Sequence, residues 1–160
     1  ERARTAGVET GVFSLDGYGG RADRDRAMAS WLRSRGAELV VLAGYMQLLS
    51  DEFLGAFPGR IVNVHPALLP AFPGLRAVEQ AIEYGVKVFG VTVHFVDQGV
   101  DTGPVILQRA LELPDVGSAQ EVLERLHPIE HELLPEAVRL IARGAVRIDP
   151  ERPRRVIVER

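Results

Sequence analysis

The 160-residue sequence has no cysteine, which excludes disulfides, thiolate metal ligands and cysteine nucleophiles. It also lacks an apolar run long enough to cross a bilayer. Basic residues do not outnumber acidic ones: 19 lysines and arginines stand against 22 aspartates and glutamates, for a formal net charge of −3. Proteins that hold nucleic acid by its phosphates need a concentrated basic face. We therefore expect no nucleic-acid partner and no membrane partner, and a cytoplasmic location suits this composition.

The overall composition is that of an ordinary globular protein, with 46% hydrophobic and 26% charged residues. Strand-like runs alternate with helix-like stretches, which is typical of an α/β fold with a largely parallel sheet. Strands are expected at residues 8–13, 39–42, 60–64, 86–96 and 105–113, and helices at 1–6, 23–35, 50–57, 75–84 and from 118 onward.

Two local patterns refine this reading. The unbroken apolar run at residues 39–42 predicts a strand buried on both faces of the sheet. Pro128 and Pro135 fall inside the last helix, where they should kink or interrupt it. We expect one domain over residues 1–148, followed by a loose tail at 149–160.

The first candidate for chemistry is the pair Asn63 and His65. The two residues are two positions apart at the end of a predicted strand, so their side chains point the same way. Open α/β sheets place their ligands at the carboxyl ends of parallel strands. An amide donor and an imidazole together suit a carbonyl oxygen that becomes an oxyanion. A polar loop with satisfied hydrogen bonds is the alternative.

The second candidate is Asp101, in the Gly- and Pro-rich stretch at residues 99–104. An aspartate in such a stretch usually forms a turn. Beside His65 it would instead fix the tautomer of the imidazole and favour its charged form. The sequence alone leaves open whether the two side chains meet.

Several motifs in order resemble one enzyme family. Residues 63–70 read Asn-Val-His-Pro-Ala-Leu-Leu-Pro, and Phe-Pro-Gly follows at 72–74. Residues 90–96 and 101–106 continue the similarity, which runs over residues 1–148. Together they are similar to the glycinamide ribonucleotide formyltransferase family. The resemblance implies a Rossmann-like formyltransferase fold, with a mostly parallel twisted sheet and helices on both faces. It also implies a cis peptide bond between Leu69 and Pro70.

The family's reaction is formyl transfer from 10-formyltetrahydrofolate, as co-substrate, to the amino group of glycinamide ribonucleotide, with no metal. By resemblance Asn63, His65 and Asp101 are the catalytic residues. Asn63 and the protonated His65 would stabilise charge on the formyl oxygen, and Asp101 would support His65. His94, within a strand, is interpreted as a packed histidine. The resemblance is compatible with a homodimer.

Binding residues are also carried over by resemblance. The folate-binding positions are Arg21, Met46, Gln47, Leu48, Leu49, Asn63, Val96, Asp97, Gln98, Gly99, Val100 and Asp101, with Gln47 in place of an arginine often found there. The nucleotide-binding positions are His127, Pro128, Ile129 and Glu130. Leu48, Leu49 and Val96 could instead be core residues, and His127 a surface residue.

The family begins with a strand and a turn that cradles the substrate phosphate at a helix N-terminus. No such segment precedes Glu1, so the N-terminal βαβ portion is missing from this sequence. We expect about 45 further residues upstream, a length compatible with a single domain. They would carry two strands that lie between residues 8–13 and 39–42.

Other functions remain open at this point. The chain could be another folate-dependent formyltransferase, or a formyltetrahydrofolate deformylase that transfers the formyl group to water. It could also be a truncated folate-binding module without catalysis. A tRNA-directed enzyme would be expected to carry a further domain and a basic surface.

Overall fold

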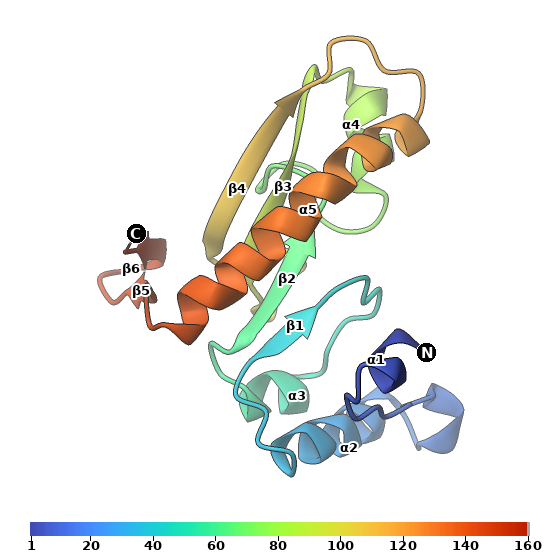
Figure 1. Cartoon of the computed structure of the whole chain (residues 1–160), viewed down its shortest axis with the longest axis vertical. Helices are drawn as coiled ribbons and strands as arrows, with labels where there is room; N and C mark the ends of the chain where they lie inside the picture. Colours follow the sequence, from blue (N-terminus) through green and yellow to red (C-terminus); the bar gives the residue numbers. More distant parts are fainter. Residues whose placement is uncertain (160) are drawn as a thin grey trace.

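The computed structural model describes residues 1–159 (Figure 1). The helices are α1 (Arg2–Thr5), α2 (Arg21–Arg33), α3 (Asp51–Ala56), α4 (Ala77–Tyr84) and α5 (Ala119–Ala142), with a 3-10 turn at Leu15–Gly17. The strands are β1 (Val40–Leu42), β2 (Ile61–His65), β3 (Val88–Phe95), β4 (Val105–Glu112), β5 (Val146–Asp149) and β6 (Arg152–Val158). Strands and helices alternate through most of this order, and the α/β class is confirmed.

The four-stranded sheet has the order β1-β2-β3-β4. β1 and β2 are parallel and joined through α3, which makes a βαβ unit. β3 runs antiparallel to both β2 and β4, so the sheet in these residues is less parallel than expected. The reason is local: only the connection through α3 crosses from one end of the sheet to the other, whereas β3 and β4 are joined by a turn.

Each face of the sheet has its own apolar packing. Val62, Val91 and Val93 are fully buried on the face that α5 covers, where Val122 and Leu126 of that helix meet them (Figure 1). The neighbouring residue of β2, Ile61, points to the other face and packs with residues of α2 and α3. Helices therefore cover both faces of the sheet near β2.

Helix α5 runs unbroken through Pro128 and Pro135, so the expected interruption does not occur. Its N-terminus is capped by Ser118, whose side chain accepts a hydrogen bond from the backbone N–H of Glu121. The apolar stripe of the helix spans both prolines, with Leu126 and Leu133 buried against the sheet. This packing holds the helix together despite the backbone donors that proline lacks.

Three other expectations are wrong. Residues 8–13 form no strand and are mostly exposed, because no neighbouring strand in the described residues offers them a ladder. Val41 is exposed rather than buried, since β1 is an edge strand that pairs only with β2 within residues 1–159. Residues 149–159 are not a loose tail: β5 and β6 pair as an antiparallel hairpin. Arg154 ties this hairpin to the body by donating to the carbonyl oxygen of Thr102.

Within residues 1–159, no helix combines the length and apolar composition needed to cross a membrane.

Candidate active site

Asn63 and His65 lie on the sheet face opposite α5. They alternate with the apolar residues Val62 and Val64 along β2, as predicted from their spacing. The register pairs Asn63 with His94 of β3, so these two side chains share one face. The loop that follows β3 brings Asp101 over the same face, because its carboxylate contacts all three residues.

The contacts of Asp101 define the site. Its Oδ2 atom lies 3.3 Å from Nδ1 of His65, and its Oδ1 atom lies 3.4 Å from Nδ2 of Asn63 and 3.6 Å from Nε2 of His94. The backbone N–H of Gly74 donates to Oδ2 at 2.8 Å. The structure thus brings Asn63, His65 and Asp101 together, which the sequence left open.

The carboxylate is held in its charged form. The contact with His94, the N–H of Gly74 and the charges of His65 and His94 lower the pKa of Asp101 to about 2, against the opposing effect of burial. Asp101 also has a φ of 52°, a left-handed conformation that aspartate tolerates better than most residues. A backbone held in this region is consistent with a residue that serves the site rather than the fold.

Both ring nitrogens of His65 face oxygen atoms. Nε2 donates to the carbonyl oxygen of Phe72 at 2.8 Å, while Nδ1 faces the carboxylate of Asp101. A neutral ring that donates from Nε2 would point its Nδ1 lone pair at a negative charge. A protonated ring could donate from both nitrogens, to the carbonyl oxygen of Phe72 and to the carboxylate of Asp101, and the ring is buried with only 5% of its surface exposed.

His94 is a site neighbour that the sequence reading missed. Its Nδ1 donates to the carbonyl oxygen of Phe95 at 2.8 Å, and its Nε2 lies 3.3 Å from the Asn63 amide. The sequence does contain a signal for it: Thr92 and His94 are the polar residues that alternate with valine and phenylalanine in β3. Such alternation places both on the face shared with Asn63 and His65.

Buried polar groups fix the loop that follows His65. The Thr92 hydroxyl, fully buried, donates to the carbonyl oxygen of Ala67 at 2.6 Å and accepts from the N–H of Leu69 at 3.1 Å. Gln108 of β4 donates to both the Thr92 hydroxyl and the carbonyl oxygen of Leu69. The bond between Leu69 and Pro70 is cis, as the resemblance implied.

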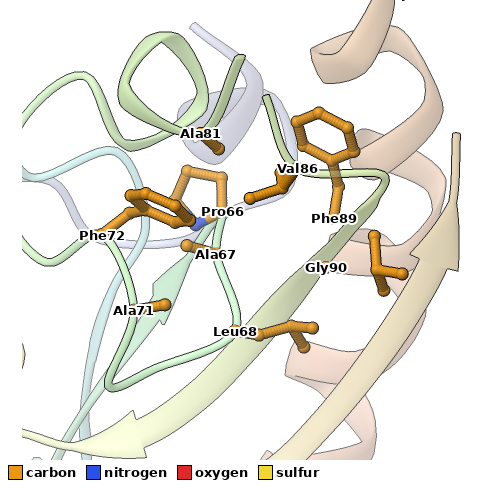
Figure 2. A pocket seen from close by; sticks show the side chains of 10 residues that line it. Pro66, Ala67, Leu68, Ala71, Phe72, Ala81, Val86, Phe89 and Gly90 are labelled. Carbon is orange, nitrogen blue, oxygen red and sulfur yellow. The ribbon is translucent and has the colours of Figure 1, made fainter. Parts of the chain in front are cut away.

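A small apolar cavity lies behind this loop (Figure 2). Its volume is about 150 Å³, and it is lined by Pro66, Ala67, Leu68, Ala71, Phe72, Ala81, Val86, Val88, Phe89 and Gly90. These side chains carry no titratable group, so the cavity offers nothing for acid–base chemistry. Phe72 links it to the site, because its side chain lines the cavity while its carbonyl oxygen holds His65.

The expected folate segment, residues 46–49, follows the carboxyl end of β1, next to the end of β2 that carries His65. Met46 is 75% exposed and Leu48 is 56% exposed, so the reading of Leu48 as a core residue is wrong. Leu49 and Val96 are half-buried against the core around Phe53. Exposed apolar side chains on an irregular segment beside polar site residues are typical of a ligand surface.

The remaining candidate binding residues have few or no direct contacts with Asn63, His65 and Asp101. Arg21 begins α2 and is exposed, and the residues from Asp97 to Val100, just before Asp101, are exposed as well. On α5, Ile129 packs against the core and His127 stacks on His131. Within residues 1–159, no hydrogen bond or ion pair joins positions 127–130 to Asn63, His65 or Asp101. These positions stay predictions.

Within the same residues, no group of three or more histidine, aspartate and glutamate side chains could hold a metal ion.

The comparisons with known proteins decide the family. Residues 1–138 match the family model described as formyl transferase. The chain belongs to the formyl transferase family. It is 43% identical over 139 residues to the phosphoribosylglycinamide formyltransferase of Bacillus subtilis, covering 87% of this chain and 71% of that protein.

Solved structures give the same result. Glycinamide ribonucleotide transformylase 1 from Symbiobacterium toebii superposes with a TM-score of 0.94 at 47% identity, covering 99% of this chain and 74% of that one. The phosphoribosylglycinamide formyltransferase from Bacillus halodurans superposes with a TM-score of 0.84 at 39% identity, covering 89% and 74%. The Rossmann-like formyltransferase fold expected from the sequence is thereby confirmed.

Proposed function

We propose that this formyl transferase moves a formyl group from 10-formyltetrahydrofolate to the amino group of glycinamide ribonucleotide, a step of purine synthesis. Its relatives bear the name of this activity at high identity and coverage. The observation that carries the proposal is the meeting of Asn63, His65 and Asp101 on one sheet face, beside the exposed segment at 46–49. The cytoplasmic location expected from the sequence belongs to the same proposal.

The chemistry follows from the contacts. The substrate amine attacks the formyl carbon, a carbon–nitrogen bond forms, and negative charge develops on the formyl oxygen. The Asn63 amide can turn to that oxygen at little cost, because its contacts to Asp101 and His94 are long, at 3.4 and 3.3 Å. A donor aimed at developing charge in a partly dry site is worth about 2.7–4 kcal/mol of transition-state stabilisation.

His65 acts through its charge. In this proposal a protonated His65 lies beside the developing oxyanion, and the Asp101 carboxylate, 3.3 Å from Nδ1, pairs with the ring and orients it. For direct donation, Nε2 must exchange the carbonyl oxygen of Phe72 for the formyl oxygen when substrate binds. Collapse of the tetrahedral intermediate then breaks the bond from the formyl carbon to N10 of the folate. The amine loses one proton and N10 gains one, so the step balances.

An acceptor assay tests this proposal. The enzyme is given 10-formyltetrahydrofolate with water alone, with glycinamide ribonucleotide, or with charged initiator tRNA. We expect tetrahydrofolate to form in step with formylated glycinamide ribonucleotide and in no other condition. Release of formate without an acceptor would instead show a deformylase, and formylated tRNA would show a different transferase.

A further inference from the structure

Helix α2 carries a buried ion pair outside the reaction centre. Arg24 has 3% of its surface exposed and Asp25 has none. The guanidinium donates to Oδ1 of Asp25 from Nε at 2.9 Å and from Nη2 at 2.5 Å. Removing two charges from water is costly unless each is paired and fully hydrogen-bonded. Adjacent charged residues on an ordinary surface helix would both face solvent. The burial of Arg24 and Asp25 therefore calls for partners that satisfy their charges and hydrogen bonds.

The contacts of the pair lie on the segment between β1 and α3. Arg24 donates through Nη2 to the hydroxyl of Tyr45 at 3.0 Å and through Nη1 to the side-chain oxygen of Gln47. Asp25 accepts from the backbone N–H of Ser50 through Oδ2 at 2.7 Å. The ion pair therefore ties three positions of one segment to α2.

The segment has little other support. Within residues 1–159, no turn or loop hydrogen bond between backbone groups involves residues 43–49. Met46 and Leu48, which alternate with the tied residues, point their apolar side chains into solvent. A segment that exposes apolar side chains without backbone support needs side-chain tethers to keep one conformation.

We propose that Arg24 is a positioning residue for the folate: held by Asp25, it fixes the conformation of residues 45–50 and so preorganises the surface on which the folate binds. This inference rests on the proposed function, which assigns residues 46–49 to folate binding. Arg24 is itself buried and need not touch the ligand. Its effect falls on folate affinity, because preorganisation removes an ordering cost that would otherwise be met on binding.

Two single variants and the double variant test whether the contact between Arg24 and Gln47 sets the affinity for the folate. Arg24→Lys keeps a charge beside Asp25 but cannot reach Tyr45 and Gln47 together, because an ammonium lacks the planar fork of a guanidinium. Gln47→Ala removes one tether from the exposed side. Each should raise the KM for 10-formyltetrahydrofolate about three- to tenfold, the effect of losing one hydrogen bond. The kcat and the KM for glycinamide ribonucleotide should change less than about twofold.

The combined variant separates positioning from direct contact. If Gln47 acts through Arg24, the double variant is no worse than the worse single variant, because both changes release the same tether. If the Gln47 side chain instead contributes to folate binding independently of Arg24, the two effects multiply, and the claim that Gln47 acts through Arg24 is overturned. Arg26→Lys is the matched control: Arg26 lies on the same helix and pairs with Asp23 in solvent, so all constants should stay unchanged.

A variant that spares the buried pair covers the case in which Arg24→Lys fails to fold. Tyr45→Phe with Gln47→Ala releases the segment while Arg24 and Asp25 keep each other. Calorimetry with tetrahydrofolate should then show affinity weakened about tenfold relative to the wild type. Unchanged affinity in this variant contradicts the positioning role even when the wild type binds folate and formylates glycinamide ribonucleotide. A wild type that does neither contradicts the proposed function instead.

Discussion

The Nδ1 atom of His65 lies 3.3 Å from Oδ2 of Asp101, while Nε2 of the same ring donates to the carbonyl oxygen of Phe72. The ring is therefore clamped between a carboxylate and a backbone carbonyl oxygen, an arrangement that suits a positive charge. Asn63 is the less tightly held donor of the site, because its contacts to His94 and Asp101 are long, at 3.3 and 3.4 Å. The separate roles of His65, Asp101 and Asn63 can be tested one residue at a time.

Replacing Asn63 with alanine should lower kcat about 100-fold, the effect of losing one donor to an oxyanion. The affinity for the folate should stay within about threefold, because the donor matters most once charge develops. Steady-state kinetics with both substrates and calorimetry with tetrahydrofolate measure the two effects. Asn63→Asp, which has the same size but adds a negative charge beside Asp101, should be at least as damaging. An unchanged kcat in Asn63→Ala would remove Asn63 from the mechanism.

Asp101 makes a pH-dependent contribution to stability. Its pKa is lowered from an ordinary value of 3.8 to about 2. A lowered pKa means that the stabilisation is present above the unfolded value and is lost as the pH falls through the folded one. Urea unfolding should therefore show Asp101→Asn less stable than the wild type at about pH 6, with a difference that shrinks between pH 3.8 and about 2. A difference that is constant with pH would argue against the charged contacts.

Gly103 permits the loop that carries Asp101 to close on β3. A Cβ atom at this position would lie 1.7 Å from the carbonyl oxygen of Phe95. Gly103→Ala should destabilise the protein by about 1–3 kcal/mol, as overpacking does, and should lower kcat by moving Asp101. Gly55→Ala is the control, because Gly55 is an exposed residue of α3 and nothing lies within 4 Å of a Cβ atom built there. Equal thermal stability of the two variants would contradict this account.

Thr92 should be needed for the loop that follows His65. Thr92→Val keeps the shape of the side chain but leaves the carbonyl oxygen of Ala67 and the N–H of Leu69 without their partner. Each unpaired buried group costs about 1–3 kcal/mol. Thr10→Val, at an exposed threonine, is the control and should be neutral. Denaturant unfolding compares the two, and a neutral Thr92→Val would mean that Gln108 alone supports the loop.

Much of the site could be predicted from local patterns. The alternation in β2 predicted that Asn63 and His65 share a face, and the family resemblance supplied the meeting with Asp101 and the cis bond before Pro70. The position of His94 depends on the register between β2 and β3, which no local pattern fixes. The hydrogen bond from His65 to Phe72 likewise depends on how the intervening loop folds back.

Other features depended on tertiary contacts. Residues 8–13 have a strand-like pattern, but the described part of the chain, residues 1–159, gives them no partner strand, so the pattern alone was misleading. Arg24 and Asp25 look like surface charges in sequence, and only the contacts with residues 45–50 explain their burial. The hairpin of β5 and β6 was not predicted, because a segment rich in proline and arginine is more typical of a solvated tail than of paired strands.

The central claim is tested most directly by following the formyl carbon. 10-Formyltetrahydrofolate labelled with carbon-13 in the formyl group is mixed with glycinamide ribonucleotide and either the wild type or Asn63→Ala, and NMR follows the label. The account predicts that the wild type moves the label into a new formamide on the ribonucleotide and that Asn63→Ala does so about 100-fold more slowly. Label that stays on the folate, or that appears as free formate in the presence of glycinamide ribonucleotide, would contradict it.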